Sequence, residues 1–510
     1  MTLSKTNYLT FLDCKKNAWL KMHKPDIYYQ YELSSFELNI IETGNEIDVL
    51  ARDLFPGGVT VEHREDDKLT RKLMKEKTSV IYQPVFISDK YITACDIFVW
   101  NPEYNAYDLY EVKSSTASSG TEGSKRNTKD YLIDMAFQKN VLDELGISIG
   151  KTFLIRLNTE YERQGSIKLD QLFLIEEFSD EVNAILDDTK QKMIVAHEYL
   201  SQESEPKGYC DCILKGSNGH CTTSKYSITD LPEYPIHDIL RIGNTKAKFT
   251  ELVDSHILDI HDIDSDFFKP NSNYALQVSI AQSGREHVDL EGISEFLETI
   301  QYPIAFLDYE TYPSALPRFD GYRPYQQIPF QFSLHVKESP ESELTHNEFL
   351  YTDINIPDHE FVKALQDYLP TSGSIIVWNK TFECTHVNAR MIVRHSEYKD
   401  FLEGLNDRVV DLMIPFMGNK KGGKDIVYQH PNQRGSYSIK AVLPIFAPEL
   451  SYKDLDIQEG GTASDTWNRI TQGKFPKEEV LMKEDALRKY CELDTYAMVR
   501  IWEVLKNKAM

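Results

Sequence analysis

Carboxylates follow apolar strand-like segments at two places in this sequence, one in each half. Asp96 follows the alternating segment YITAC, and Glu111 ends the segment YDLYE a few residues later. In the second half, Asp308 and Glu310 follow the apolar run Ile304–Leu307. Side chains alternate across a strand, so Asp308 and Glu310 lie on one face. Two such acidic strand ends, about 200 positions apart, favour two separate sheets rather than one.

The length agrees with this division, because cores stop growing at about 250–300 residues and the chain has 510. The 41% of hydrophobic and 27% of charged residues are typical of a soluble globular protein. No apolar run reaches the roughly 18 residues that a membrane span needs. The first twenty residues also lack the apolar core of a signal peptide. We therefore expect a soluble, cytoplasmic protein.

Hydrophobic periodicity predicts an α/β fold. The predicted helices are residues 35–54, 130–145, 178–202 and 478–506, and the predicted strands are 80–87, 92–100, 107–113, 151–157, 171–177 and 304–307. We expect an α/β domain over residues 1–225, a small helical connector over 226–300, and a second α/β domain over 301–510.

The first acidic segment has the equipment of a metal-dependent hydrolase. If the strands that carry Asp96 and Glu111 pair as a hairpin, the two carboxylates lie together, and Lys113 shares a face with Glu111. Carboxylate oxygens are ligands for Mg²⁺ or Mn²⁺, and the amine can hold or polarise the attacking water. An ordinary amphipathic hairpin with surface charges is the alternative interpretation.

The spacing of Asp96, Glu111 and Lys113 resembles the PD-(D/E)XK nuclease superfamily, and more closely its RecB-like branch. Glu46 matches the ligand that this branch carries before its sheet, and Gln138 matches its glutamine on the helix after the lysine. The resemblance implies a restriction-endonuclease-like domain over residues 1–225. It implies metal ligands at Glu46, Asp96 and Glu111, and catalytic residues at Lys113 and Gln138.

Four cysteines are arranged like metal ligands. Cys210, Cys212 and Cys221 are crowded into GYCDCILKGSNGHC, and Cys14 lies far upstream. Such clustering, within an odd total of seven, favours thiolates in a reduced compartment over a disulfide framework. Four cysteines can bind Zn²⁺ or an iron–sulfur cluster. Their placement resembles the iron–sulfur nucleases of the AddB and CRISPR-associated exonuclease type, which implies a [4Fe-4S] cluster. A zinc site with His220 in place of Cys14 is the alternative.

The second acidic segment belongs to a wider set of carboxylates. Glu383 begins a predicted helix after the apolar segment IIVW, and Tyr490 and Asp494 lie four apart on one helical face. Together with Asp308 and Glu310, these acids can hold two divalent ions, which clamp the attacking and leaving oxygens of a phosphodiester. Tyr490 is placed to orient or deprotonate the water.

This set resembles the DEDD 3′–5′ exonuclease superfamily on a ribonuclease H-like fold, in its tyrosine variant. Glu383 stands where that family usually has aspartate, and Asp411 matches a non-catalytic aspartate between its motifs. Residues 306–335 also resemble a bacterial family of unknown function found fused behind RecB-like domains. The resemblance implies metal ligands at Asp308, Glu310, Glu383 and Asp494, with Tyr490 as a catalytic residue.

Other reactive side chains are predicted to serve structure. Cys95, Cys384 and Cys491 are expected to be small core residues that face away from the sites. His335, His386 and His430 are expected to be surface or packing residues.

The net charge of −24 is unusual for a nucleic-acid-binding protein. Carboxylate metal sites are, however, acidic by construction. Basic residues gather in the stretches Gly120–Lys129 and Gly418–Lys440. The second stretch interleaves Tyr428 and Tyr437 with Lys420, Lys421, Lys424 and Arg434, which suits backbone contact and base stacking. A solvated loop is an equally good interpretation of each stretch.

These resemblances imply a Mg²⁺- or Mn²⁺-dependent nuclease that cuts DNA, as an exonuclease on single strands, in DNA repair or phage defence. A second hypothesis is a nucleic-acid-binding or scaffold subunit with one or both sites inactive, because Gln83 and Glu383 depart from the family patterns. A third makes the second domain an RNA exonuclease. A protein partner or oligomer is compatible with each hypothesis.

Overall fold

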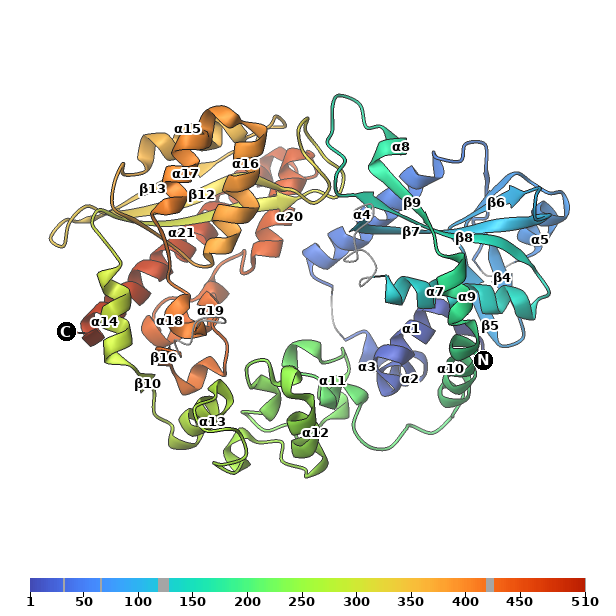
Figure 1. Ribbon diagram of the computed structural model, residues 1–510, viewed down its shortest axis with the longest axis horizontal. Helices are drawn as coiled ribbons and strands as arrows, with labels where there is room; N and C mark the ends of the chain where they lie inside the picture. Colours follow the sequence, from blue (N-terminus) through green and yellow to red (C-terminus); the bar gives the residue numbers. More distant parts are fainter. Residues whose placement is uncertain (31–32, 65–66, 118–127, 419–425, 510) are drawn as a thin grey trace. The chain divides into compact units, whose positions relative to one another are not determined.

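The computed structural model describes residues 1–30, 33–64, 67–117, 128–418 and 426–509. The chain forms two compact units, and each is described by itself. The first unit comprises Met1–Thr229 and Ala315–Pro324, and the second comprises Asp230–Ser314 and Tyr325–Met510. The mixed α/β class is confirmed in both units (Figure 1). No helix of the described residues is both long and apolar enough to cross a membrane.

The first unit is built on a six-stranded sheet with the order β2-β3-β6-β7-β8-β9. Its central strand β7 runs antiparallel to β6 and parallel to β8. A three-stranded sheet with the order β1-β5-β4 belongs to the same unit. The strands are β1 (Leu3–Ser4), β2 (Val59–Thr60), β3 (Val80–Tyr82), β4 (Val85–Ile87), β5 (Tyr91–Ala94), β6 (Ile97–Asn101), β7 (Ala106–Ala117), β8 (Ile149–Asn158) and β9 (Phe173–Glu177).

Two predicted strands are wrong in one respect, because each divides between the two sheets. Residues 80–87 form β3 and β4, and residues 92–100 form β5 and β6. The first break falls at Gln83, whose φ of 52° is left-handed, and at the following proline, which has no amide hydrogen to donate. The second break falls opposite, where the amide of Gln83 donates to the carbonyl of Asp96 at 2.8 Å. Asp96 therefore lies at a junction between sheets rather than within a ladder.

Helices cover the sheets of the first unit. The predicted helices 35–54 and 130–145 are confirmed as α4 (Ser35–Arg52) and α7 (Lys129–Glu144), whereas 178–202 divides at Ile185 into α9 (Ser179–Ala184) and α10 (Leu186–Leu200). A capping box of Ser34 and Glu37 starts α4. The other helices are α1 (Lys5–Asp13), α2 (Lys15–His23), α3 (Pro25–Tyr28), α5 (Lys68–Lys75), α8 (Leu169–Leu172), α11 (Ser224–Ser227), and the 3-10 turns η1 (Asp211–Leu214) and η2 (Ser217–Gly219).

The second unit is built on a five-stranded sheet with the order β13-β12-β11-β14-β15. Strand β11 pairs antiparallel with β12 and parallel with β14. The strands are β11 (Ile304–Pro313), β12 (Gln327–Lys337), β13 (Leu344–Leu350), β14 (Ser374–Val377) and β15 (Val409–Asp411), with a small ribbon of β10 (His287–Val288) and β16 (Tyr428–Gln429).

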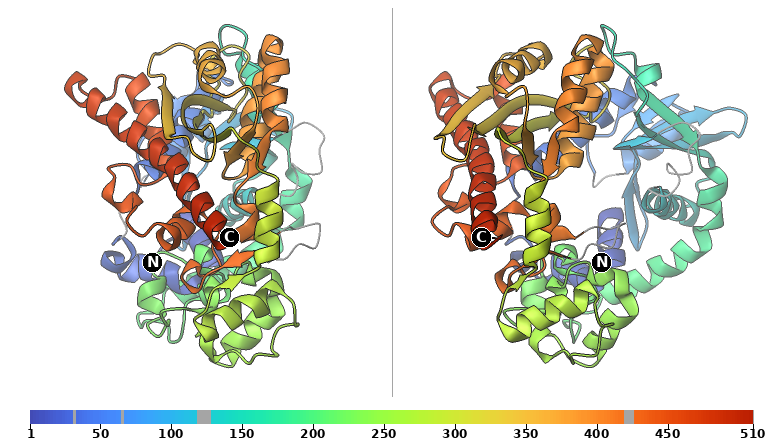
Figure 2. Two further views of the ribbon diagram at one scale, coloured as in Figure 1. Left: turned by 90° about the vertical axis from the view of Figure 1, so that its left-hand side faces the viewer. Right: turned by 60° about the vertical axis from the view of Figure 1, so that its left-hand side comes forward.

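The predicted C-terminal helix is confirmed as α21 (Lys477–Ala509), which packs along β11 and β12 (Figure 2). The remaining helices are α12 (Lys246–Asp254), α13 (Asn273–Ser283), α14 (Leu290–Glu298), α15 (Asp358–Tyr368), the π-helix η6 (Phe382–Asn388), α16 (Ala389–Arg394), α17 (Lys399–Asp407), α18 (Ile414–Met417), α19 (Ile439–Phe446) and α20 (Gly460–Thr471), with 3-10 turns η3 (Ile236–Asp238), η4 (Ile242–Thr245), η5 (Ile260–Asp262), η7 (Ser396–Tyr398), η8 (Pro431–Gln433) and η9 (Tyr452–Asp454).

Strand β11 is buried on both faces, and its alternation positions the acids. Leu307 and Tyr309 pack into the core that includes residues of α15, α16 and α17. Ile304 and Phe306 pack on the opposite side, against Met498 and Trp502 of α21. Since Asp308 and Glu310 continue the alternation of Ile304 and Phe306, they lie on the α21 face. A register shift after Glu310 is a bulge of the kind found beside functional sites.

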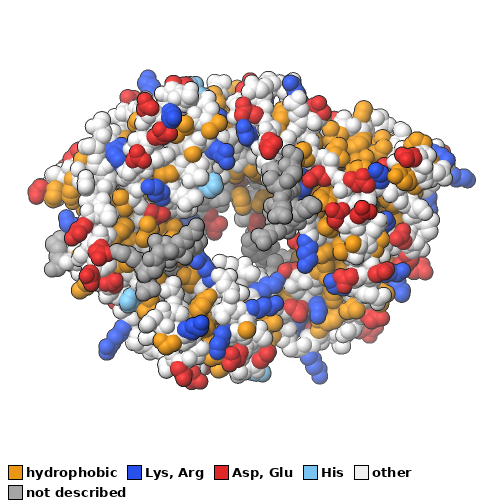
Figure 3. All heavy atoms as spheres, viewed as in Figure 1, with side chains coloured by type: hydrophobic (Ala, Val, Ile, Leu, Met, Phe, Trp, Pro, Cys, Tyr) orange, Lys and Arg blue, Asp and Glu red, His pale blue; other side chains and the backbone are white. Residues whose placement is uncertain are grey.

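Part of each of the two basic stretches lies outside the described residues. Residues 120–127 and 419–425, which include Lys420, Lys421 and Lys424, lie outside the described residues. The prediction that Tyr428 stacks on bases is wrong, because its ring lies in the core and its hydroxyl donates to Glu286 at 2.6 Å. Figure 3 shows acidic and basic side chains interspersed over the described residues of the face in view.

Candidate active sites and metal centre

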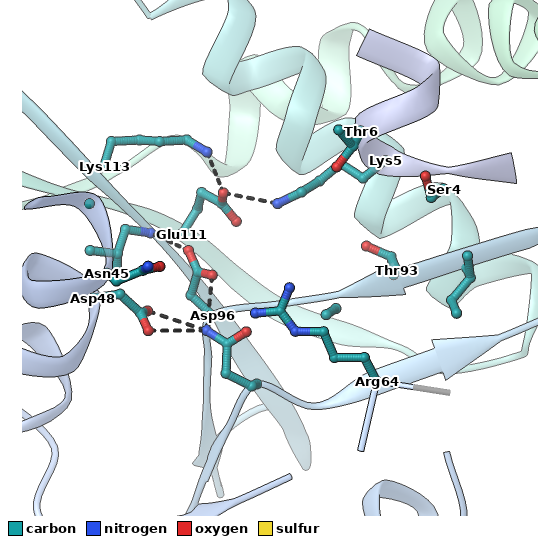
Figure 4. Close-up of a pocket in the computed structure, with 15 residues that line it drawn as sticks. Ser4, Lys5, Thr6, Asn45, Asp48, Arg64, Thr93, Asp96, Glu111 and Lys113 are labelled. Carbon is teal, nitrogen blue, oxygen red and sulfur yellow. Dashed lines mark hydrogen bonds and ion pairs between the residues drawn. The ribbon is translucent and has the colours of Figure 1, made fainter. Parts of the chain in front are cut away.

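The first candidate site is a pocket of about 430 Å³ in the first unit. Glu111 and Lys113 from β7 line it together with Asp96 and with Lys5, the first residue of α1 (Figure 4). Arg64 extends into the same pocket. The structure thus brings together the three residues of the first predicted motif, and it adds two cations that sequence reasoning did not identify.

Asp96 is held by the strand break described above. Its Oδ2 accepts a hydrogen bond from the amide of Val112 at 2.8 Å, and the amide group of Gln83 donates to its Oδ1 at 3.3 Å. Burial, and then the charge of Glu111, raise the pKa of Asp96 to about 7. A bound cation would counter both causes and keep this carboxylate ionised at neutral pH.

Glu111 is almost fully buried but is surrounded by donors. The ammonium groups of Lys113 and Lys5 lie 2.5 and 3.1 Å from its Oε1, and the side-chain amide of Gln138 donates to its Oε2 at 2.7 Å. Burial acts to raise the pKa of Glu111, but the two lysines outweigh it and hold the pKa below the usual value. This carboxylate is therefore charged at neutral pH.

Asp134 completes a network of two acids and two lysines. Lys5 and Lys113 approach its carboxylate to 3.0 and 2.7 Å, and Gln138 donates to it at 2.9 Å. Asp134 and Gln138 are four residues apart on α7, so they present one face to the site. Gln138 lies where the predicted glutamine was expected, against Glu111. Its Oε1 is buried, with no hydrogen-bond partner in the described part of the chain.

The acid of α4 that faces this pocket is Asp48, not Glu46. Glu46 is exposed and does not line the pocket, whereas Asp48 does. The reason is helical geometry, because two positions along a helix are turned by roughly 200°. Asp48 accepts hydrogen bonds from Gln83 at 3.3 Å to both of its oxygens and pairs with Arg52 at 2.5 Å. The structure therefore separates Glu46 from the other predicted ligands.

The four predicted cysteine ligands converge in the first unit. Cys14 lies at the junction of α1 and α2, Cys210 and Cys212 lie beside and in η1, and Cys221 follows η2. Sulfur–sulfur distances are 2.7 Å for Cys210–Cys212, 3.5 Å for Cys212–Cys221 and 4.0 Å for Cys221–Cys210, and all four sulfurs lie within 4.8 Å of one another. Four thiols so close together suit one metal centre. His220 is not in this group.

The second candidate site lies between β11 and α21 in the second unit. Oxygens of Asp308 and Glu310 and the sulfur of Cys491 lie within 4.8 Å of one another. The Cys491 thiol is 3.9 Å from Oδ2 of Asp308. The expectation that Cys491 faces away is therefore wrong, because α21 packs this residue directly onto the acidic face of β11. Cys95 and Cys384, in contrast, pack with hydrophobic cores as expected.

Helix α21 also supplies Tyr490 and Asp494, one turn apart and buried. The hydroxyl of Tyr452 donates to Oδ1 of Asp494 at 2.5 Å. The ammonium of Lys440 lies 5.5 Å from the ring centre of Tyr490 and 5.3 Å from that of Tyr452. A Cβ atom on Gly460, at the start of α20, would be only 3.7 Å from the Tyr490 hydroxyl oxygen. The start of α20 therefore borders the site closely.

The acids of the second site repel one another. Burial, and then the charge of Asp494, raise the pKa of Asp308 well above its usual value. Burial, and then Asp308, do the same to the pKa of Glu310. Burial raises the pKa of Asp494 to about 6, against the opposing effects of Tyr452 and Lys440. These carboxyl groups repel one another too strongly to ionise together without a cation. They are therefore suited to bind divalent cations jointly.

Glu383 lies in the π-helix η6, a rare form that is frequent at functional sites. It is buried, and its Oε2 has no hydrogen-bond partner in the described part of the chain. Burial, and then Asp308, raise its pKa well above the usual value. Glu383 therefore lies near Asp308 but outside the group of ligand atoms within 4.8 Å.

Asp411 holds the loop that leads to Glu383. Its carboxylate accepts from the backbone amides of Asn379, Lys380 and Met413 at 3.0 to 3.1 Å. Asn379 has a φ of 90°, and this left-handed turn redirects the chain from β14 toward η6. Asp411 therefore positions the loop that leads to Glu383, a role that the sequence did not predict.

Of the three histidines predicted to be surface or packing residues, His335 also lies in a group with His346 and Glu492 whose possible ligand atoms are within 4.8 Å of one another. His335 is buried with its Nδ1 2.8 Å from the hydroxyl of Thr495, His386 is exposed, and His430 caps η8. Sequence reasoning missed Lys5, Asp48, Asp134, Lys440 and Tyr452. Asp134 and Asp48 had a signal, since Asp134 stands one helical turn before Gln138 and Asp48 two residues after Glu46 on α4, but Lys5, Lys440 and Tyr452, like Arg64, come from separate elements with no motif.

Comparisons with known proteins complete this description. A family model described as a domain of unknown function (DUF2779) matches residues 305–438. "Uncharacterized protein MG366 homolog" of Mycoplasma pneumoniae is 23% identical over 361 residues, which are 63% of this chain and 51% of that protein. "Uncharacterized protein UU173" of Ureaplasma parvum is 26% identical over 231 residues, 40% of this chain and 31% of that protein. The chain spans about half the length, or less, of these relatives.

Proposed function

We propose that this chain is a divalent-metal-dependent nuclease that hydrolyses phosphodiester bonds of DNA, with one site in each unit. The observation that carries the proposal is that buried and half-buried carboxylates from separate elements converge in both units, although burial and repulsion oppose the ionisation of Asp96, Asp308 and Glu310. Such an arrangement costs folding free energy unless a cation joins it. The resemblances to PD-(D/E)XK and DEDD nucleases agree with Mg²⁺ or Mn²⁺ as that cation.

In the second site, Asp308, Glu310 and Asp494 would hold the metal, with Glu383 as the fourth carboxylate. The bound ions supply charge neutralisation at the phosphate and lower the pKa of water. The Tyr452 hydroxyl fixes the orientation of Asp494. Burial, and then Asp494 and Glu310, raise the pKa of Tyr490, so its hydroxyl keeps its proton and orients the attacking water as a donor.

In the first site, Asp96 and Glu111 would hold the metal, and Asp48 is the nearby carboxylate of α4. Lys113 is held between Glu111 and Asp134, where it can position the attacking water. Arg64 and Lys5 place positive charge in the pocket, which suits a phosphodiester. The same proposal includes a PD-(D/E)XK fold for the first unit and a ribonuclease H-like fold for the second.

We propose that the four cysteines bind a metal centre. Which metal they bind is part of the same proposal. The resemblance favours a [4Fe-4S] cluster. The alternative is Zn²⁺, which four cysteines can bind in a tetrahedral site. Either centre would tie Cys14 and the N-terminal helices to the segment around η1. Iron, sulfide and zinc analysis of anaerobically purified protein distinguishes the two.

Two other functions remain to be compared with this proposal. The feature that favours a nucleic-acid-binding or scaffold subunit with an inactive second site is Glu383, which stands where the DEDD family usually has aspartate. An RNA exonuclease activity of the second unit is the other alternative. A cytoplasmic setting and a role in DNA repair or phage defence belong to the proposal and rest on the resemblance.

The deciding experiment uses Asp96→Asn, Asp308→Asn and the double variant of the full chain, with Asp353→Asn, an exposed acid, as the control. End-labelled single-stranded DNA and the matching RNA are digested with Mn²⁺. Loss of a metal ligand removes several kcal/mol of transition-state stabilisation, so each single variant should lose its own reaction by about 10³-fold. Cleavage that persists unchanged in the double variant would refute the nuclease proposal.

A further inference from the structure

A cluster of two histidines and one glutamate lies in the second unit, apart from the acidic site. His359 is in the first turn of α15, His395 ends α16, and Glu397 belongs to η7. One nitrogen of each ring and a carboxylate oxygen lie within 4.8 Å of one another. His359 and Glu397 are exposed and His395 is half-buried, so an ion can reach them from solvent.

A buried carboxylate fixes the proton on His395. Asp358 is fully buried and accepts hydrogen bonds at 2.9 Å from Nε2 of His395 and from Nε of Arg394. A carboxylate only accepts, so the hydrogen of the neutral imidazole is on Nε2, and Nδ1 carries a lone pair. That nitrogen lies 3.7 Å from an oxygen of Glu397, which is also an acceptor. Two acceptors that face each other at this distance favour a cation between them.

The second ring is oriented in the same manner. The hydroxyl of Tyr398 is 2.7 Å from Nδ1 of His359, which leaves Nε2 for another partner. The rings of His359 and His395 are 4.5 Å apart and inclined by 60°. His335, His346 and Glu492 form a similar group of ligand atoms within 4.8 Å, but His335 is buried, whereas His359 and Glu397 are open to solvent.

We propose that His359, His395 and Glu397 bind one Zn²⁺ ion. Two imidazoles and a carboxylate suit a borderline-soft ion such as Zn²⁺ better than Mg²⁺. Asp358 and Tyr398 play the part of the outer groups that orient metal-bound histidines. The ion would join the first turn of α15 to the end of α16, whose preceding segment η6 carries Glu383. The site is independent of the nuclease proposal.

Calorimetric titration of the full chain with Zn²⁺ tests this site. Excess Mg²⁺ is present to occupy the acidic sites, and the cysteine centre is left as purified. We expect one Zn²⁺ per chain that is lost, or bound at least tenfold more weakly, in His359→Asn and in Glu397→Gln. Both residues are exposed, so these changes leave the pairing of Asp358 with Arg394 in place. His386→Asn, an exposed histidine of η6, should bind as the unmodified chain does.

A second measurement records the unfolding temperature with and without Zn²⁺. An ion that joins α15 to α16 stabilises the folded chain by mass action, so Zn²⁺ should raise the midpoint in the unmodified chain and in His386→Asn but not in His359→Asn. Zinc binding with the same stoichiometry and affinity in His359→Asn and Glu397→Gln would overturn the proposal, as would a chain that binds no additional zinc.

Discussion

In the first unit two lysine ammoniums contact the carboxylates of the candidate site, whereas in the second unit the carboxylates face one another and a tyrosine hydroxyl. Lys5 and Lys113 lie within 3.1 Å of Glu111. Lys440, the cation near the second site, lies over aromatic rings and donates to the carbonyl of Gln458 at 2.6 Å. Glu111 of the first site is therefore ionised, whereas Asp308 and Glu310 of the second site are disfavoured as anions.

The difference shows that two sites of similar composition can depend on metal to different degrees. The lysines of the first site lower the pKa of Glu111, so one ligand is ready before a cation arrives. In the second site burial and mutual repulsion raise the pKa of Asp308 and of Glu310, so metal binding must displace protons there. Metal should therefore contribute more to the stability of the second unit than of the first.

The largest expected effect comes from neutralising one acid in each site. Glu111→Gln removes one of the two carboxylates that Lys5 and Lys113 share, with Asp134 left as the other, and should lower the free energy of unfolding by about 3 kcal/mol. Asp308→Asn relieves a buried, repelled carboxylate and should raise the free energy of unfolding by about 1 kcal/mol. Urea unfolding in buffer free of Mg²⁺ and Mn²⁺ measures both changes. Changes of the same sign in the free energy of unfolding of the two variants would contradict the proposed difference between the sites.

The stabilisation of the folded chain by Mn²⁺ should also depend differently on the two sites. A ligand at 100 times its dissociation constant stabilises the folded state by about 2.7 kcal/mol. We expect most of this gain to disappear in Asp308→Asn and a smaller part to disappear in Asp96→Asn. Thermal unfolding of each variant over a Mn²⁺ series provides the measurement. An equal loss in both variants would show that the lysines of the first site do not substitute for metal.

The sequence predicted those parts of each site that follow a regular period. Alternation placed Asp308 with Glu310, and helical spacing placed Tyr490 with Asp494, because strand and helix geometry fix those relations locally. It did not place Lys5 or Tyr452, since their proximity to the acids depends on tertiary packing of elements far apart in the chain. Glu46 and Asp48 show the limit within one helix, where a match two residues off turns the side chain to the opposite face.

Removal of one hydroxyl should weaken the second site alone. Tyr452→Phe deletes the 2.5 Å hydrogen bond to Asp494, and hydrogen bonds to charged groups contribute about 1.5–3 kcal/mol. The pKa of Asp494 should then rise further, so Mn²⁺ binds about tenfold more weakly and cleavage by this site falls accordingly. Calorimetric Mn²⁺ titration in an Asp96→Asn background isolates the second site.

Tyr428→Phe is the matched control for this change, because its hydroxyl donates to Glu286 at 2.6 Å elsewhere in the same unit. It should affect stability but not the affinity for Mn²⁺. If the two variants weaken Mn²⁺ binding equally, Tyr452 has only a general structural role and the second site does not depend on it.

The smallest effect concerns the buried imidazole on the acidic face of the second sheet. His335 lies two residues from Ser333, the strand partner of Asp308, and burial followed by His346 lowers its pKa to about 3. It is therefore neutral at physiological pH and offers no charge to these acids, unlike the lysines of the first unit. A histidine with a lowered folded-state pKa stabilises the fold above its unfolded pKa of about 6.5, and this stability is lost as the pH falls below that value.

The stability that His335 contributes relative to His335→Asn should therefore decrease by about 1 kcal/mol between pH 7 and pH 5.5. Urea unfolding of both proteins at the two pH values measures the change, and His256→Asn, an exposed histidine of the same unit, should show none. A difference that grows as the pH falls would mean that His335 is protonated in the folded chain. The second site would then have a cation besides Lys440, and its contrast with the first site would rest on how closely these charges approach the carboxylates.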